Sequence, residues 1–260
     1  MSEQQGKVAV VTGGSRGIGR ACAEALAHDG WSVAIGYRTS EADAKETLAS
    51  LEAIGTPGLA IAMDVTEEGS VTEAFRRVGD ELGPVTGLLN NAGMSRDGLL
   101  LKYPMDVYER TMATNLRGAF LCSQSALRGM LRAKWGRIVN MSSAVALRGN
   151  AGQTAYAATK AGLVGLTRSL AREVGAKGIT VNALCPGGIE TDTMKEFGPD
   201  AAVSMGLTYQ GLLDVFAQES AIKRLNEVED VALVAVLLAS DAGAGITGSL
   251  ISIDGGTSPY

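Results

Sequence analysis

Short apolar runs alternate with longer segments of helical pattern along almost the whole chain, and this rhythm restricts the possible folds more than any other feature. The apolar runs lie at residues 8–11, 32–36, 59–63, 87–90, 137–141, 180–184 and 250–253. The helical pattern covers residues 21–27, 42–54, 71–82, 105–132, 154–174 and 228–238. Strands joined by helices of this length form right-handed crossovers, so their sheet is parallel and covered on both faces. The sequence predicts a single doubly wound α/β domain over residues 1–260, with about seven strands.

One segment departs from this rhythm. Residues 192–226 mix glycine and proline with large apolar side chains such as Met194, Leu207 and Phe216. Such an excursion has two interpretations, a helical lid over a substrate or a contact between subunits. We expect a substrate lid over about residues 192–226.

Composition excludes several classes of protein. Hydrophobic residues make up 46% of the chain and charged residues 20%, as in globular proteins. A net charge of −5 provides no electrostatic footprint for nucleic acid. The single histidine, His28, excludes a histidine-based triad or a multi-histidine zinc site, so no metal is expected. Three cysteines without a C-x-x-C pair favour reduced thiols and a cytoplasmic location. The sequence shows neither an apolar run of membrane-spanning length nor a signal segment, so no membrane contact is expected.

A glycine-rich turn follows the first apolar run and directly precedes a helix. Its sequence is Thr12-Gly13-Gly14-Ser15-Arg16-Gly17-Ile18-Gly19, with the spacing G-x-x-x-G-x-G. Glycines allow the backbone to turn sharply and to approach a pyrophosphate, which the free N–H groups at a helix N-terminus attract. An ordinary strand-to-helix turn is the alternative. The position after the first strand favours a dinucleotide site in a Rossmann domain, with cofactor contacts from Gly13, Ser15, Arg16, Gly17, Ile18 and Gly19.

The residues after the second apolar run bear on which dinucleotide binds. A carboxylate there holds the ribose 2′-hydroxyl of NAD, whereas an arginine accommodates a 2′-phosphate. This chain has Arg38 at that place and no acid before Glu41. Arg16 in the glycine-rich turn supplies a second guanidinium for the same phosphate. We therefore expect NADP(H) rather than NAD(H); the alternative is that both arginines are simply solvated.

Two further strand ends have residues suited to the same cofactor. Asp64 and Val65 follow the third apolar run, where the carboxylate can accept from the adenine amine and the valine can pack on the ring. Asn91, Ala92 and Gly93 close the fourth run with small residues that permit close approach. Each stretch could equally be a plain loop, so both predictions depend on the glycine-rich turn.

A tyrosine and a lysine four residues apart mark the candidate reaction centre. Tyr156 and Lys160 share one face of a helix, so a phenol and an ammonium lie side by side. A neighbouring positive charge lowers the pKa of a tyrosine toward the range useful for general acid catalysis. Ser142 and Ser143 end the fifth apolar run, where a ligand crevice is expected. A helix-surface pair is the alternative for the tyrosine and lysine, and strand capping is the alternative for the serines.

Taken together, these motifs resemble those of the short-chain dehydrogenase/reductase family, over residues 7–256. The resemblance rests on residues 12–19, Asn90 to Gly93, Asn115, Ser143, Tyr156 with Lys160, and Pro186-Gly187. Within the family the chain looks most like the 3-oxoacyl-[acyl-carrier-protein] reductases, because of residues 149–153, 246–248 and 254–256.

The resemblance implies a role for each matching residue. Tyr156 would protonate the substrate carbonyl oxygen as hydride arrives from the nicotinamide, and Ser143, chosen over Ser142, would hydrogen-bond to the same oxygen. Lys160 would bind the nicotinamide ribose and lower the pKa of the tyrosine. Asn115 would hold a water that replenishes the proton. The wall behind the nicotinamide and the site of its carboxamide would be formed by Pro186, Gly187, Ile189 and Thr191.

The resemblance also implies a substrate and partners. We expect NADPH-dependent reduction of a 3-oxoacyl thioester carried on an acyl carrier protein, in fatty-acid or polyketide-type biosynthesis. Basic residues near the cleft would steer the acidic carrier, with docking at Lys134 and Lys177 beside Arg132 and Arg172. A homotetramer would form through helices at residues 120–131 and 163–170. The alternatives are an NADP-dependent sugar or secondary-alcohol dehydrogenase and, more distantly, a non-catalytic NADP-binding sensor.

Overall fold

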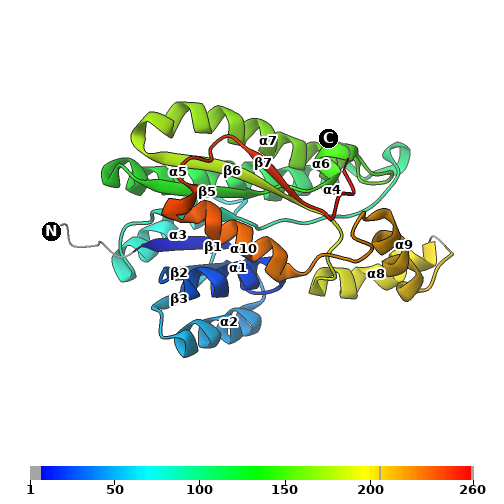
Figure 1. The fold of residues 1–260 in the computed structure, drawn as a ribbon, viewed down its shortest axis with the longest axis horizontal. Coiled ribbons are helices and arrows are strands. Elements are labelled where there is room, and N and C mark those ends of the chain that lie inside the picture. Colours follow the sequence, from blue (N-terminus) through cyan, green and yellow to red (C-terminus); the bar gives the residue numbers. More distant parts are fainter. Residues whose placement is uncertain (1–6, 205, 259–260) are drawn as a thin grey trace.

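A single parallel sheet organises the computed structural model, which describes residues 7–204 and 206–258. In the described residues the sheet has seven strands in the order β3-β2-β1-β4-β5-β6-β7 (Figure 1). The strands are β1 (Val8–Thr12), β2 (Ser32–Tyr37), β3 (Gly58–Ala62), β4 (Gly87–Asn90), β5 (Gly136–Met141), β6 (Ile179–Pro186) and β7 (Leu250–Ile253). Every pairing between neighbouring strands is parallel, so the predicted doubly wound fold is confirmed.

Helices cover both faces of the sheet. One core contains side chains of α3 (Glu68–Glu81), α5 (Gly118–Ala133) and α7 (Thr154–Val174). The core on the opposite face contains side chains of α1 (Gly17–His28), α2 (Glu41–Ile54) and α10 (Val228–Ala239). The strands β1, β4, β5 and β6 are buried along their whole length, because each contacts helices above and below. This burial explains why they are continuous apolar runs rather than alternating ones.

The helical stretch predicted over residues 105–132 is broken in the structure. Helix α4 (Met105–Met112) ends in a π-helical turn at Ala113–Arg117, and α5 begins at Gly118. A π turn holds one residue more than an α turn, so it shifts the side chains that follow around the helix axis. Periodicity alone does not reveal such an insertion, since the apolar pattern continues on both sides of it.

Residues 192–226 form helices rather than an irregular loop. They contain α8 (Asp192–Ser204) and α9 (Tyr209–Glu219), which pack on each other beyond the carboxyl ends of the strands, at the right of Figure 1. The short helix α6 (Val145–Arg148) follows β5, and 3₁₀ turns lie at Leu100–Lys102, Gly175–Lys177 and Asp241–Gly243. Among the described helices, none combines the length and the apolar character that crossing a membrane requires.

Candidate active site

The carboxyl ends of β1, β4, β5 and β6 meet at one edge of the sheet. The chain passes from β1 outward to β2 and β3 on one side, and β4 pairs with β1 on the other. This reversal of strand order is the place where open α/β sheets bind ligands. The loops that follow these strands, together with the start of α7, form the candidate site.

The glycine-rich turn after β1 depends on its glycines. Gly13 and Gly17 have φ angles of +62° and +55°, which residues other than glycine rarely adopt. A Cβ on Gly19 would lie 2.2 Å from the carbonyl oxygen of Gly13, so a side chain there would displace the turn. Helix α1 begins at Gly17 and leaves N–H groups free at the edge of the site.

The other residues of this turn hold it against its surroundings. Ser15 is buried, and its carbonyl accepts a hydrogen bond of 3.0 Å from the Thr47 hydroxyl. Ile18 packs against the core beneath α1. Ser15 and Ile18 thus have structural contacts whether or not they also touch a cofactor.

Thr12 connects the turn after β1 to the loop after β4. Its hydroxyl oxygen accepts hydrogen bonds from the N–H groups of Asn91 and Ala92, at 3.0 and 2.9 Å. The Asn91 amide donates in turn to the carbonyls of Thr12 and Gly13, at 3.1 and 3.0 Å. Sequence reasoning did not assign Thr12 a role, although a hydroxyl at the last residue of a strand was a usable signal. The two loops therefore form one rigid unit.

The arginines expected to bind a 2′-phosphate are both exposed. The Arg16 guanidinium faces Glu196 on α8, with 3.6 Å between Nη1 and Oε2. Arg38, just beyond β2, contributes positive charge at Asp64. Both side chains are available to an anion, and Arg16 shares its position with an acid of α8.

Asp64 and Val65 are held in place by the protein itself. Burial alone would raise the pKa of the Asp64 carboxyl, but hydrogen bonds from Thr66 and the charge of Arg38 outweigh burial and lower it. The Thr66 N–H and hydroxyl donate to Asp64 Oδ1 at 2.9 and 2.7 Å. Val65 is buried, and a Cβ on Gly118 would approach its Cγ2 to 2.8 Å. These contacts position Asp64 but leave the predicted adenine contact untested.

The two serines after β5 face different partners. The Ser142 hydroxyl donates to the carbonyl oxygen of Lys160 at 2.8 Å, so it joins the end of β5 to α7. The Ser143 side chain interacts with the Tyr156 hydroxyl, which lowers the pKa of the tyrosine, and its oxygen accepts a hydrogen bond from the Val145 N–H at 3.2 Å. The geometry therefore separates a structural serine, Ser142, from one that shares the candidate reaction centre.

The pKa of Tyr156 is shifted in the direction opposite to the one expected. Burial raises it, and the hydrogen bond with Ser143 lowers it by less. The Nζ atom of Lys160 lies 5.5 Å from the centre of the Tyr156 ring. Burial also lowers the pKa of Lys160 to about 8, which weakens its positive charge at neutral and alkaline pH. Desolvation thus dominates both groups of the pair in the free chain.

A cradle beside Lys160 fits a flat, polar cofactor. The Lys160 ammonium donates to the carbonyl of Met141 at 2.7 Å. A Cβ on Gly93 would lie 3.5 Å from Lys160 Nζ and 3.4 Å from Asn115 Oδ1, so a side chain there would occupy the space in front of both groups. These residues suit the ribose and nicotinamide of a dinucleotide, with the glycine-rich turn close by for its pyrophosphate.

Asn115 lies in the π turn, and its side chain makes three hydrogen bonds. Its Oδ1 accepts from the Met94 N–H at 2.8 Å, and its Nδ2 donates to the Met94 carbonyl at 2.9 Å and to Thr159 Oγ1 at 3.1 Å. Thr159, which sequence reasoning missed, precedes Lys160 directly. Asn115 therefore joins the loop after β4 to α7, and its role in a water relay stays a prediction.

The end of β6 closes the opposite wall of the site. A Cβ on Gly187 would lie 2.7 Å from the Cα of Asp254, so the two segments touch through backbone. The Pro186 carbonyl accepts from the N–H of Ala144 at 2.9 Å. Ile189 is buried, and Thr191, at the start of the segment with α8, has its Cβ 3.7 Å from the Cβ position of Gly17. The wall thus reaches across to the glycine-rich turn.

The predicted docking lysines do not lie near the candidate active site of their own chain. Lys134 ends α5 just before β5, and Lys177 precedes β6, so both lie at the amino ends of the strands. Because β5 has six residues, about 20 Å separates the two edges of the sheet. The expectation that they lie near the cleft of their own chain is wrong, since each crossover helix carries the chain back to the amino edge before the next strand.

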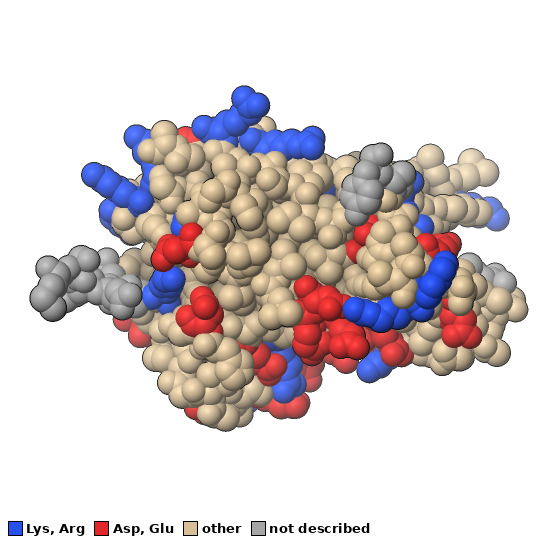
Figure 2. Space-filling view, in the orientation of Figure 1, with Lys and Arg blue, Asp and Glu red and all other residues tan. Residues whose placement is uncertain are grey.

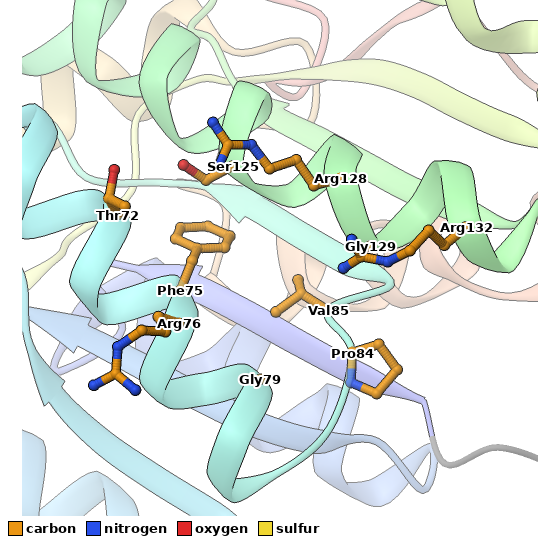
Figure 3. A pocket seen from close by; sticks show the side chains of 10 residues that line it. All are labelled: Thr72, Phe75, Arg76, Gly79, Pro84, Val85, Ser125, Arg128, Gly129 and Arg132. Carbon is orange, nitrogen blue, oxygen red and sulfur yellow. The ribbon is translucent and has the colours of Figure 1, made fainter.

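A separate groove lies between α3 and α5 at that amino edge. It has a volume of about 350 Å³ and contains Phe75, Val85 and Pro84 between the helices, with Arg128 and Arg132 along its α5 side (Figure 3). Arg132, expected to join the docking lysines, lines this groove instead of the candidate site. No cluster of side chains that could hold a metal ion occurs in the part of the chain that the structure describes.

Comparison with known proteins agrees with this geometry. The family model described as short chain dehydrogenase matches residues 7–202. Over 252 residues the chain is 42% identical to the 3-oxoacyl-[acyl-carrier-protein] reductase FabG of Pseudomonas aeruginosa, covering 97% of each chain. It is 39% identical over 250 residues to the protein of the same name from Staphylococcus epidermidis, covering 96% of this chain and 98% of that one.

Solved structures show the same likeness. A variant of the actinorhodin polyketide ketoreductase, solved with NADPH, superposes with a TM-score of 0.95 at 30% identity and covers 100% of both chains. A short-chain alcohol dehydrogenase described as putative, from Sinorhizobium meliloti, superposes with a TM-score of 0.89 at 37% identity, covering 97% of this chain and 96% of that one.

Proposed function

The chain belongs to the short chain dehydrogenase family and is an oxidoreductase, and we propose that it reduces 3-oxoacyl thioesters to 3-hydroxyacyl thioesters with NADPH. The observation that carries this proposal is the grouping of Ser143, Tyr156 and Lys160 beside Gly93 at the carboxyl edge of the sheet. The names of the similar reductases and of the polyketide ketoreductase support an acyl substrate on a carrier protein.

In the proposed reaction the nicotinamide supplies a hydride to the carbonyl carbon. The hydroxyl groups of Ser143 and Tyr156 donate hydrogen bonds to the carbonyl oxygen, which gains negative charge as the C=O bond is reduced. Tyr156 passes its proton to that oxygen and becomes a phenolate. Lys160 stabilises the phenolate and holds the ribose, and proton return follows the path through Asn115 and the backbone around it.

The raised pKa of Tyr156 suits this direction of reaction. A tyrosine that is protonated at neutral pH is ready to act as an acid, whereas oxidation of an alcohol needs its phenolate. The same shift makes Tyr156 a weaker acid, so the charge on the oxygen has to be stabilised by Ser143 as well.

NADP(H) is the proposed cofactor because Arg16 in the glycine-rich turn and Arg38 just beyond β2 are both exposed, and because β2 is not followed directly by an acid. The NADPH in the ketoreductase structure agrees with this choice. Comparison of kcat/KM for NADPH and NADH tests it. A ratio close to one would contradict the assignment.

The decisive assay mixes the purified protein with NADPH and acetoacetyl thioester and follows the loss of nicotinamide absorbance. We expect turnover with the thioester, and turnover lower by about 10² to 10⁴-fold with Tyr156→Phe. Turnover of a simple sugar or secondary alcohol at a far higher kcat/KM would instead support the alternative dehydrogenase function. NADPH binding with no turnover of any ketone would support the sensor.

A polyketide-type acyl chain is a second candidate substrate. It is favoured by the full-length match to the polyketide ketoreductase. We propose that α8 and α9 form the substrate lid and determine the choice. Competition between a straight-chain 3-oxoacyl thioester and a cyclic ketone distinguishes the two, since the preferred class has the higher kcat/KM.

Assembly into a homotetramer is proposed from exposed faces of helices. Helix α5 exposes Phe120 and Leu131, and helix α10 exposes Leu233 and Leu237, four large apolar side chains that a monomer leaves in water. Beside α5, the helix α7 exposes small residues along its outer side, among them Ala161. Light scattering tests this proposal, and Phe120→Glu should weaken the assembly.

Such an assembly gives the docking lysines a place to act. In a two-fold contact the α5 helices of two copies run antiparallel, so Lys134 at the end of one α5 approaches the start of the other, next to Asn115. Figure 2 shows Lys and Arg along the upper edge, where α7 carries the exposed Arg168 and Arg172. We propose that an acidic acyl carrier protein docks there, with Lys134 and Lys177 serving the active site of the neighbouring copy.

Charge reversal of both lysines tests the docking. It should lower kcat/KM for carrier-bound substrate and leave kcat/KM for a small thioester unchanged; equal effects would contradict docking. A cytoplasmic location is also proposed, since the cysteines of the described chain are free thiols.

A further inference from the structure

Hydrogen bonds join the loop after β4 to the turn that precedes α7. The Gln153 side-chain amide donates to Asp97 Oδ1 at 2.9 Å, and the Gly98 N–H donates to the carbonyl of Gly152 at 2.8 Å. Gln153 is the residue directly before α7, and Tyr156 follows three residues later. The loop is thus fastened to the helix end that carries the candidate acid.

The hydrogen-bond network requires an acceptor at position 97. Asn150 donates through its Nδ2 to Gln153 Oε1 at 3.0 Å, which leaves the Gln153 NH₂ group to face Asp97. The Ser95 hydroxyl also donates to Asp97 Oδ1, at 3.3 Å. A carboxylate accepts both bonds without reorientation. The loop beyond it is held by the Tyr103 hydroxyl, which donates to the Arg96 carbonyl at 2.9 Å.

Asp97 is also a charge that acts on Tyr156. Three groups surround or act on the phenol: the Ser143 hydroxyl, two residues beyond β5, the Lys160 ammonium on α7, and the exposed Asp97 carboxylate in the loop after β4. A nearby negative charge disfavours a phenolate, and Asp97 adds to burial in raising the pKa of Tyr156. The Lys160 ammonium, 5.5 Å from the centre of the ring, is a charge of the opposite sign.

We propose that Asp97 is a positioning residue for the reduction: its hydrogen bond to Gln153 fixes the start of α7, and with it the Tyr156 hydroxyl that donates to the ketone, and its carboxylate adds a negative charge to the surroundings of that hydroxyl. This inference rests on the proposed role of Tyr156 as the acid. One side chain thus supplies both the hydrogen bond to Gln153 and the negative charge, and the two effects can be separated experimentally.

Asp97→Asn removes the charge and retains an oxygen that can accept from Gln153. Gln153→Ala removes the fastening and retains the charge. In kcat/KM for reduction, measured between about pH 6 and about pH 10, activity falls on the alkaline side as the acid form is lost. We expect Asp97→Asn to move that fall to lower pH, and Gln153→Ala to lower kcat while the fall stays in place.

Asp43→Asn is the matched control, because Asp43 is a half-buried carboxylate on α2, on the opposite face of the sheet from α7. It changes the net charge equally and should leave the pH profile unmoved. An unmoved alkaline limb in Asp97→Asn, or an equal shift in Asp43→Asn, overturns the inference.

A second readout does not need turnover. The titration of Tyr156 can be followed by NMR. The tyrosines are labelled with carbon-13 at the ring carbon that bears the hydroxyl, and the Tyr156 signal is the one that is missing in Tyr156→Phe. We expect Asp97→Asn to titrate at lower pH than the wild type, and coincident titrations overturn the inference. A wild type that reduces no ketone overturns the proposed function instead, and the titration still decides the effect of Asp97.

Discussion

The Nζ atom of Lys160 lies 2.7 Å from the backbone carbonyl oxygen of Met141, to which it donates a hydrogen bond. Met141 is the last residue of β5, and Ser143, proposed to donate to the carbonyl oxygen, follows two residues later. The contact therefore joins the lysine of the helix to the strand that presents the serine. Burial in this position is also what lowers the pKa of the Lys160 ammonium to about 8.

Lys160 should make stability depend on alkaline pH. Its pKa is about 8 in the folded chain and 10.5 as the ordinary value, so between these limits the unfolded chain holds a proton that the folded chain has released. Stability therefore rises with pH across this window, by at most on the order of 3 kcal/mol. Urea unfolding of the wild type and Lys160→Met from about pH 8 to about pH 10 measures the difference. Parallel curves would contradict the prediction.

Tyr156→Phe should abolish most of the activity without harming the fold. Loss of a general acid lowers turnover by about 10² to 10⁴-fold. The aromatic ring remains, and the loops that hold the nucleotide are unchanged. NADPH affinity should therefore stay within about twofold of the wild type, because only one hydroxyl group and its hydrogen bonds are lost. Steady-state kinetics and fluorescence titration with NADPH check both. Retention of full activity would remove Tyr156 from the mechanism.

Alanine at Ser142 and at Ser143 should have opposite consequences. Ser142→Ala removes the bond to the Lys160 carbonyl and should cost about 1 kcal/mol of stability, with kcat reduced less. Ser143→Ala removes a donor to the developing charge and should lower kcat by about 10² to 10³-fold with little effect on melting. Thermal melts and kinetics of the two variants make each the control for the other. Reversed effects would show that the serines had been assigned wrongly.

Glu196→Gln should improve NADPH binding. Glu196 faces Arg16 at 3.6 Å, and both side chains are about half exposed, so the pair is weak and competes with a phosphate for the same guanidinium. Removal of the acid should tighten NADPH binding by up to about fivefold and leave NADH unchanged. Glu46→Gln is the control, because Glu46 pairs with Arg20 on α1, the helix that follows the glycine-rich turn. Equal gains for both cofactors would contradict a phosphate role for Arg16.

Local sequence patterns predicted the parts of the site that lie on one element. Tyr156 and Lys160 are one helical turn apart, and helix geometry alone brings them to one face. The turn at Gly13 to Gly19 was predicted from residue type, because a positive φ and a close backbone contact both require glycine. The parallel direction of the strands followed from the rule for crossovers.

Contacts between elements were beyond such patterns. The partners of Asn115 are Met94 and Thr159, which lie 21 and 44 residues away, and the π turn that aims the Asn115 side chain leaves no mark on the apolar rhythm. The choice between Ser142 and Ser143 came from a family resemblance and acquired a physical reason only from their different partners.

The sequence by itself thus determined the fold class, the glycine-rich turn and the tyrosine–lysine pair, because the alternation of short runs, the glycine spacing and the four-residue spacing are all local patterns. Only the tertiary structure decided that the docking lysines lie at the opposite edge, that burial raises the pKa of Tyr156, and that Asp97 joins the loop after β4 to the residue before α7. These outcomes depend on which distant side chains pack together and how much water they exclude, and no short stretch of sequence carries that information.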